Sequence, residues 1–314
     1  MTAQAQSLPL TPPGAATHLF ARLVAAATLP LILFGGSVTS LDAGMAVEGW
    51  LTVQSSQGER LLWLYPLEDW FRNIGQFVEH SHRMVGTVVG LFAIGAVLAA
   101  FVEGASAAAR RATTIALIAV CIQGTIGGFR VLENSENLAF LHGALGQAVF
   151  GVIVAAAVIS SPRWLNAEPK LLAQATSLRR TANNAVTSVY MMIVAGAWLR
   201  HTDEPVALAV HLMVLLYTAA SVFGLVHKLK SLETGSQGDW LHVCAKRLTV
   251  LFAAQVALGI FAFAAVFIWY GPTATGVHDS VLPTLHVLGG ALLLGQCVAS
   301  RLWVGKLLRQ GEVA

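Results

Sequence analysis

Long apolar stretches alternate with short polar segments along the whole chain. Each stretch is close to the roughly 20 residues that a helix needs to cross a bilayer. The pattern predicts eight transmembrane helices, over Phe20–Leu41, Met84–Val102, Ala112–Gly128, His142–Ser160, Ala185–Leu199, Val206–Val226, Leu248–Tyr270 and Pro283–Val304. The expected fold is therefore an all-α polytopic membrane protein.

Composition supports this interpretation and excludes an ordinary soluble enzyme. Of the 314 residues, 56% are hydrophobic and 11% are charged, whereas a soluble domain carries roughly 25% charged residues. Eight helices leave room for short loops and no large soluble domain. A net charge of +3 is too small to indicate binding to nucleic acid.

The distribution of cations predicts the orientation in the membrane. One set of loops and the C-terminal end contain Arg110, Arg111, Arg163, Lys170, Arg179, Arg180, Lys228, Lys230, Lys246, Arg247, Arg301, Lys306 and Arg309. The positive-inside rule then places both termini in the cytoplasm. The first 21 residues contain no Lys or Arg, so we expect neither a signal peptide nor a mitochondrial transit peptide, which favours a prokaryotic inner membrane.

The chain is expected to consist of two related halves. The predicted parts are a cytoplasmic tail (1–19), an N-terminal four-helix bundle (20–160) with an outer loop (42–78), a cytoplasmic linker (161–184), a C-terminal four-helix bundle (185–304) and a second tail (305–314). Leu141-His142, followed by two glycines at fixed offsets, recurs as Leu285-His286. Such a repeat predicts two bundles related by an approximate twofold axis along the membrane normal.

Each even-numbered predicted helix has one histidine near its outer end: His82, His142, His211 and His286. One such histidine is commonly a hydrogen-bonded core residue, but four at matched depth, two in each half, indicate a shared role. Imidazoles on facing helices can clamp a metalloporphyrin from both sides, so heme is the expected ligand. Zinc would need more ligands close by, and the three cysteines form no Cys-x-x-Cys pair.

Other residues near these histidines have two possible uses. The glycines Gly143, Gly146, Gly289 and Gly290 would admit a flat macrocycle or allow close helix packing. The cations Arg83, Arg130 and Arg200 could bind heme propionates or simply reach the membrane surface. Both alternatives remain open for each group.

The halves differ in the residues around their first histidine. Glu79 lies three residues before His82, on the same helix face, whereas Leu208 occupies the matching place before His211. Electron transfer through two equal hemes would not need this carboxylate, which we expect to have access to water at the outer interface. His80 lies on another face of the helix and is expected at the surface.

These residues resemble the heme A synthase family, whose members convert heme O to heme A. The resemblance depends on Glu79-His80-Ser81-His82-Arg83, on Gln123-Gly124 with Gly127-Gly128-Phe129-Arg130, and on Leu141-His142-Gly143. It also depends on Gly196-Ala197-Trp198-Leu199-Arg200-His201 and the two C-terminal histidines. The matching stretches extend over all eight predicted helices.

The resemblance implies a resident heme b on His211 and His286, and a substrate heme O on His82 and His142, with Glu79 as the catalytic carboxylate. The family oxidises a porphyrin methyl group to a formyl group through a hydroxymethyl intermediate, with oxygen from water. It also implies delivery of heme O by a heme O synthase, an electron acceptor of unknown identity, and a possible homo-oligomer. Many members have a cysteine pair in the first outer loop, which this chain lacks.

Two other functions fit parts of the pattern. A diheme cytochrome b-type electron carrier would hold two permanent hemes and carry out no substrate chemistry. A transporter would need polar groups at the midplane of several helices, for which the candidates are Gln123, Gln147, Gln255 and Gln296. These glutamines are more simply interpreted as hydrogen bonds between helices.

Overall fold

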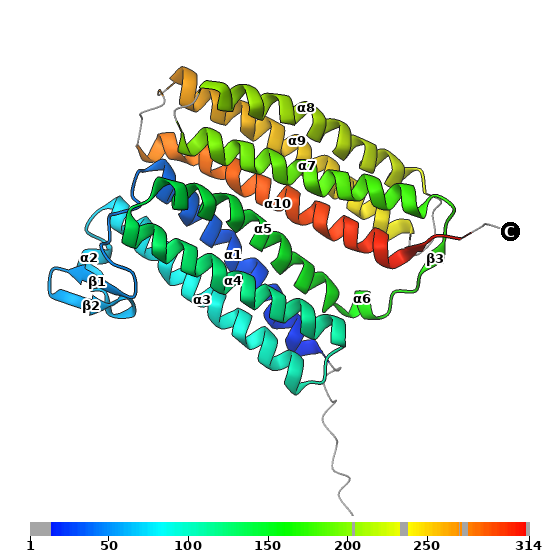
Figure 1. Cartoon of the computed structure of the whole chain (residues 1–314), viewed down its shortest axis with the longest axis horizontal. Helices are drawn as coiled ribbons and strands as arrows, with labels where there is room; N and C mark the ends of the chain where they lie inside the picture. The colour runs from blue at the N-terminus through cyan, green and yellow to red at the C-terminus, as the bar shows by residue number, and fades with distance from the viewer. Residues whose placement is uncertain (1–13, 203–204, 233–237, 270, 272–275, 312–314) are drawn as a thin grey trace, which may run out of the picture.

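The structure is a computed structural model that describes residues 14–202, 205–232, 238–269, 271 and 276–311. Residues 1–13 and 312–314 of the two predicted tails, and the predicted helix end at Tyr270, lie outside the described residues. Within these ranges the chain is almost entirely helical, which confirms the predicted fold class (Figure 1).

Eight helices in the described ranges have 24 residues or more. They are α1 (Ala15–Ser40), α3 (Ile74–Val102), α4 (Ala107–Glu133), α5 (Glu136–Ile159), α7 (Ala175–His201), α8 (Pro205–Lys230), α9 (Gly238–Ala264, continued by the π-helical turn Ala265–Trp269) and α10 (Val277–Leu307). Seven of them are long and apolar enough to cross a membrane; α7 is the exception. The protein is therefore a multi-pass membrane protein, and its eighth span stays a prediction.

The exception at α7 has a physical explanation. Its first turns carry Arg179, Arg180 and Asn183, which lower the mean hydropathy. One face of the helix is nevertheless buried through its length, at Leu178, Ala182 and several later positions. This face packs against α8 and α10, so α7 is stabilised by its neighbours in the bundle.

The helices extend beyond the apolar stretches because polar residues terminate them. Asn73, Ser106 and Ser135 each accept a hydrogen bond from a backbone N–H in the first turn of α3, α4 and α5. Helix α1 begins at Ala15, inside the predicted tail, because the Glu103 carboxylate accepts from the backbone N–H groups of Ala16 and Thr17. Such a distant cap leaves no local sequence signal.

The long helices form two four-helix bundles that share one contact pattern. In the first bundle α1, α3, α4 and α5 contact each other in a ring, and in the second α7, α8, α9 and α10 do the same. The halves meet where α1 contacts α10, α5 contacts α7, and α5 contacts α10 (Figure 1). Exchanging the halves leaves this pattern unchanged, as an approximate twofold axis requires.

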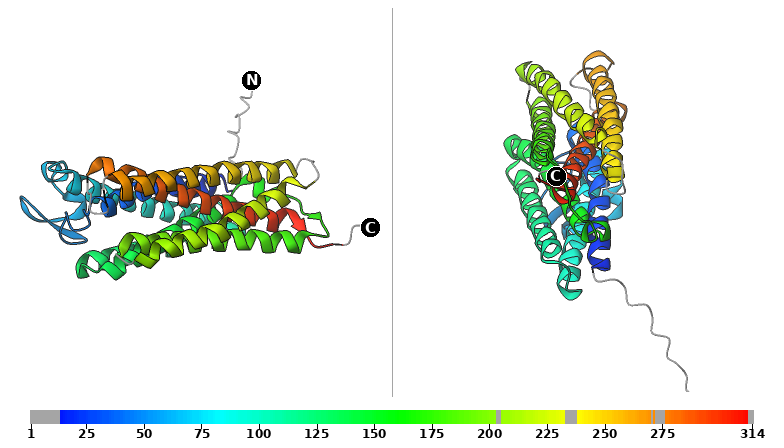
Figure 2. Two further views of the ribbon diagram at one scale, coloured as in Figure 1. Left: turned by 90° about the horizontal axis from the view of Figure 1, so that it is seen from above. Right: turned by 90° about the vertical axis from the view of Figure 1, so that its right-hand side faces the viewer.

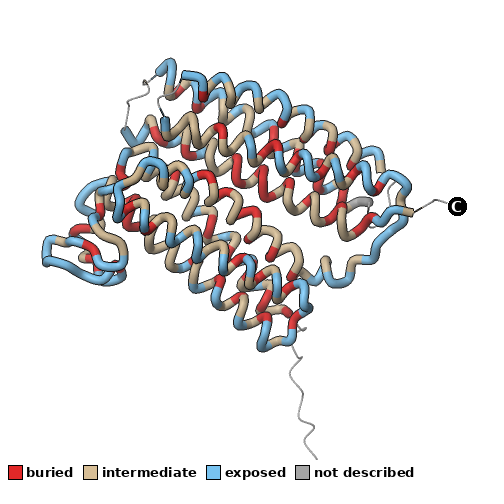
Figure 3. Tube along the Cα trace, in the orientation of Figure 1, coloured by how far each residue is buried: buried red, intermediate tan, exposed pale blue. Residues whose placement is uncertain are grey.

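Burial follows the inward faces of the helices (Figure 3). Large apolar side chains such as Leu91, Ile122 and Leu216 are exposed. The two cores differ in composition. The second bundle buries large side chains including Leu225, Leu248 and Trp303, whereas the core of the first is rich in alanine and valine. The exposed apolar faces are the lipid-facing surface expected of a membrane bundle.

The outer loop between α1 and α3 is folded, and lies at one end of the molecule (Figures 1 and 2). It contains the hairpin β1 (Thr52–Ser55) and β2 (Gly58–Leu61), the 3-10 turn η1 (Leu62–Leu64) and the short helix α2 (Leu67–Trp70). The pattern of apolar and polar residues did not predict this hairpin.

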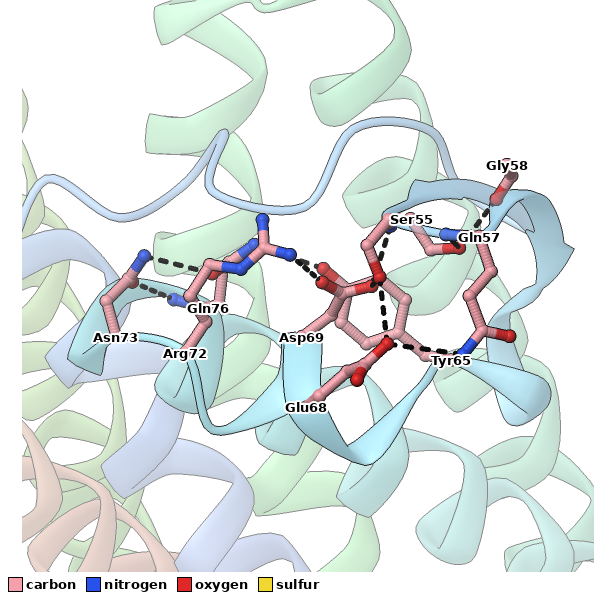
Figure 4. A network of polar contacts seen from close by, with 10 residues as sticks. Ser55, Gln57, Gly58, Tyr65, Glu68, Asp69, Arg72, Asn73 and Gln76 are labelled. Atoms are coloured by element: carbon pink, nitrogen blue, oxygen red, sulfur yellow. Dashed lines mark hydrogen bonds and ion pairs between the residues drawn. The ribbon is translucent and has the colours of Figure 1, made fainter.

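Side chains of α2 hold the hairpin in place (Figure 4). Asp69 is 1% exposed and accepts hydrogen bonds from the backbone N–H and the hydroxyl of Ser56, both at 2.8 Å. Arg72 forms an ion pair with the same carboxylate. The Ser56 backbone bond, then its hydroxyl and Arg72, hold the pKa of Asp69 below its usual value despite burial.

The opposite end of the molecule holds the helix α6 (Pro162–Leu165) and a two-residue parallel pairing of β3 (Lys170–Leu171) with β4 (Leu308–Arg309). Trp164 and Trp240 both contact the ring of Trp303, and Arg163 stacks over Trp240. These contacts join the linker to the end of the second bundle.

Candidate functional site

The four predicted histidines lie two and two within the bundles. His82 on α3 faces His142 on α5, with ring centroids 6.3 Å apart and planes at 81°. His211 on α8 faces His286 on α10, with centroids 6.4 Å apart and planes at 72°. Each histidine lies in the first third of its helix, so both pairs are near the end that carries the outer loop.

The separation of the rings fits one metal ion between each pair. A metal–nitrogen bond of about 2 Å and about 1.1 Å from ring nitrogen to ring centre, each counted twice, give about 6.2 Å. Within the described ranges, no group of three or more His, Cys, Asp or Glu side chains could hold a metal ion. The donor set is thus a pair of imidazoles, which is a common arrangement for heme iron.

Each histidine ring lies against a glycine of the preceding long helix. These contacts join Gly35 to His82, Gly127 to His142, Gly196 to His211 and Gly259 to His286. A Cβ at these glycines would lie 2.7–3.0 Å from the ring carbon Cε1, closer than van der Waals contact allows. Gly127 and Gly196 belong to the motifs quoted above, but this contact with a histidine ring was not predicted for any of the four glycines.

The glycines that the sequence analysis did single out have other neighbours. A Cβ at Gly146 would lie 3.1 Å from Gln123 Nε2, and one at Gly289 would lie 2.2 Å from Gln255 Oε1. Similarly, a Cβ at Gly290 would be 3.4 Å from Gln255 Nε2, and one at Gly143 would be 3.4 Å from His201 Nε2. These contacts show close packing between helices at all four glycines, which is compatible with the approach of a macrocycle.

Several buried polar atoms around the histidine pairs have no hydrogen-bond partner within the described part of the chain. They are Nδ1 of His211 and of His286, and Oε1 of Gln123 and of Gln255. Buried polar atoms are nearly always satisfied in folded proteins. Unsatisfied atoms gathered beside two facing imidazoles fit a site that binds a polar or metal-containing group.

Glu79 is buried and fully engaged. Its side chain is 3% exposed; one oxygen lies 2.6 Å from Arg83 Nη2, and the other accepts from the backbone N–H of Val47 at 2.8 Å. Arg83 also donates to the carbonyls of Val47 and Gly49, both at 2.7 Å. The expected access of Glu79 to water is thus wrong for this structure, because the outer loop covers the carboxylate.

The neighbours of Glu79 also bind the outer loop. His80 is 1% exposed and packs between Tyr65 and Trp70, with ring centroids 4.6 Å from each. The prediction that His80 lies at the surface was wrong, because the loop folds back over this face of α3. Ser81 accepts from Trp70 Nε1 at 3.0 Å. His82 alone turns inward, where its Nδ1 lies 3.0 Å from the carbonyl of Leu31.

The other two predicted cations also contact backbone carbonyls. Arg130 donates to Gly44 in the outer loop. Arg200 on α7 donates to the carbonyl of Gly36 on α1 at 2.7 Å and to the Ser40 hydroxyl, and so joins the two halves. Neither forms an ion pair with a described carboxylate, which leaves positive charge available for an acidic ligand near both pairs.

The fold and these sites define a class of protein, a polytopic membrane protein of two related bundles with one histidine pair each. Residues 20–214 match the family described as cytochrome oxidase assembly protein, COX15-CtaA. The chain belongs to this family, which is the heme A synthase family, an enzyme family that acts in the assembly of cytochrome oxidase. The match includes Glu79 and three of the four histidines; His286 lies beyond it. No curated protein matches the chain.

Proposed function

We propose that this chain is a heme A synthase that oxidises the methyl group of heme O to the formyl group of heme A. The observation that carries the proposal is the pairing of His82 with His142, together with Glu79 and Arg83 next to His82 along α3; Leu208 and Leu212 stand at the matching places along α8, next to His211. The oxidation of heme O is therefore expected in the N-terminal half, which has these charged groups. We propose a prokaryotic inner membrane as its location, with both termini in the cytoplasm.

In this proposal the first pair holds the substrate, heme O, and the second holds a resident heme b. When bound, heme b would accept electrons and pass them to an acceptor. Arg130 and Arg200, which form no ion pair with a carboxylate among the described residues, are candidates to bind heme propionates. Because Arg200 binds the Gly36 carbonyl on α1, its side chain does not simply extend to the membrane surface.

The reaction balances as two oxidations of two electrons each. Methyl plus water gives hydroxymethyl, two electrons and two protons; hydroxymethyl then gives formyl, two electrons and two protons. Loss of electrons from the methyl group creates positive character beside the macrocycle. An ionised Glu79, stabilised by Arg83 and the Val47 N–H, would stabilise that charge. Action as a base on water would first require one of these contacts to open.

A pigment extract of the purified protein, separated by chromatography, tests the proposal. Heme b together with heme O or heme A would support the synthase. Heme b alone, at two per chain, would refute it and support the diheme electron carrier, which the nearly equal separations of 6.3 and 6.4 Å also fit.

A further inference from the structure

We propose that Gln123 and Gln255 are positioning residues, each of which orients the second histidine of its bundle. Gln123 on α4 acts on His142, and Gln255 on α9 acts on His286. The inference rests on the proposed function in one respect, namely that these histidines bind heme iron.

The contact with the backbone is the same in both halves, whereas the ring nitrogen nearest the amide differs. Gln123 Nε2 donates to the backbone carbonyl of His142 at 2.7 Å and lies 3.0 Å from its ring Nδ1. Gln255 Nε2 donates to the carbonyl of His286 at 3.1 Å and lies 3.4 Å from its ring Nε2. A packing accident would not be expected to occur twice at positions related by the twofold axis.

The backbone contact determines which way each amide faces. A carbonyl oxygen is an acceptor only, so the NH₂ end of the glutamine must point toward it. One amide hydrogen of each glutamine is then directed at the backbone carbonyl of one histidine. The amide oxygens of Gln123 and Gln255 lie on the other side, buried and without partners in the described structure.

The surrounding residues leave space for these amides. Glycines at 146 and 290 face the two Nε2 atoms, where a Cβ would lie 3.1 and 3.4 Å away. One helical turn after each glutamine comes the glycine that touches the histidine ring, at 127 and 259. Thus α4 and α9 each present a glutamine and a glycine on one face, and together they hold the backbone and the ring of the opposing histidine.

This arrangement matters for a metal ligand. Groups that orient a ligating histidine from outside the coordination sphere typically change metal affinity or activity 10- to 100-fold when they are removed. The first histidine of the N-terminal pair is held differently, by the Leu31 carbonyl. The glutamines therefore act on one ligand in each site, and each should affect its own site alone.

The test uses the full-length protein and replaces each glutamine by methionine, which has similar length and volume but no donor. Low-spin EPR signals, the reduction potential and retention of heme b report on the second site, and titration with heme O reports on the first. We expect Gln255→Met to shift the EPR signal and weaken retention of heme b about 10- to 100-fold. Gln123→Met should leave heme b unchanged and weaken heme O binding by a similar factor.

Gln296→Met is the matched control, since Gln296 bonds Ser300 on its own helix and should change neither site. Normal heme binding and spectra in both Gln123→Met and Gln255→Met would overturn the inference, because side-chain volume alone would then be enough. If one of these two variants fails to insert into the membrane, heme binding by the other variant decides whether the inference holds. A wild-type protein that binds no heme would instead refute the proposed function.

Discussion

Replacement of Glu79 by glutamine separates catalysis from folding more cleanly than replacement by alanine. Glutamine can still accept from the Val47 N–H, so it keeps the shape of the contact and loses the charge opposite Arg83. The side chains of Arg83 and Glu79 are 9% and 3% exposed, so this is a buried ion pair. Both variants leave the Arg83 guanidinium without a carboxylate, which costs about 3–5 kcal/mol in buried pairs, and alanine also leaves the Val47 N–H without an acceptor. Glutamine keeps one acceptor oxygen, so its cost should lie at the lower end of this range.

The effect on chemistry should be measurable in the fraction of the variant that folds. Removal of a group that stabilises charge in the transition state typically lowers the rate about 10²- to 10³-fold. We therefore expect Glu79→Gln to insert, to retain heme b, and to leave heme O unconverted or stopped at the hydroxymethyl stage. Glu79→Asp should recover part of the activity because it restores the charge at shorter reach.

The assay is the yield of heme A, by chromatography of extracted pigments, from cells supplied with heme O. Asp69→Asn is a suitable control, because Asp69 is another buried carboxylate paired with an arginine, but in the outer loop. Wild-type yields of heme A from Glu79→Gln would refute the electrostatic argument and leave Glu79 as an anchor for the outer loop.

Three further outcomes follow from the geometry. Alanine at His211 or His286 should abolish the low-spin heme b spectrum without preventing insertion, and a normal spectrum in both variants would place the ligands elsewhere. Gly259→Ala would put a Cβ 3.0 Å from the His286 ring; overpacking of this kind costs about 1–3 kcal/mol, so heme b should dissociate faster, as measured by transfer to apomyoglobin. The lowered pKa of Asp69 implies that its contact with Ser56 stabilises the outer loop above pH about 4 and is lost as pH falls through the folded-state pKa. Tryptophan fluorescence should show this acid transition in the wild type, and an unchanged transition in Asp69→Asn would contradict it.

The long helices were predictable because contact with lipid requires long apolar stretches in the sequence. Apolar stretches marked all the long helices, since each must bury or expose apolar side chains along most of its length. Helix ends were less predictable because they depend on single polar contacts, such as Glu103 with the first turn of α1. The outer-loop hairpin was missed because its small core of Val47, Val53 and Tyr65 gives no extended periodic pattern.

The part of the candidate site that is repeated in the two halves of the sequence was predictable. The histidines stood out because they recur at matched positions, and the structure brings them together in the expected pairs. The glutamines recur as well, each four residues before a glycine, but the sequence alone could not show that their amides face histidines. The burial of His80 depends on how the loop folds back over α3, which no local signal indicates.

The contact between the two halves also has an evolutionary consequence. A four-helix unit that paired with its own copy would make every contact twice, once on each side of the axis, so any substitution would act on both sites. In the joined chain the two sides can differ. Arg200 on α7 binds α1, whereas Thr39, four residues after the equivalent glycine on α1, bonds within its own helix. Fusion of two such units into one polypeptide thus allows the residues around one histidine pair to change independently of those around the other.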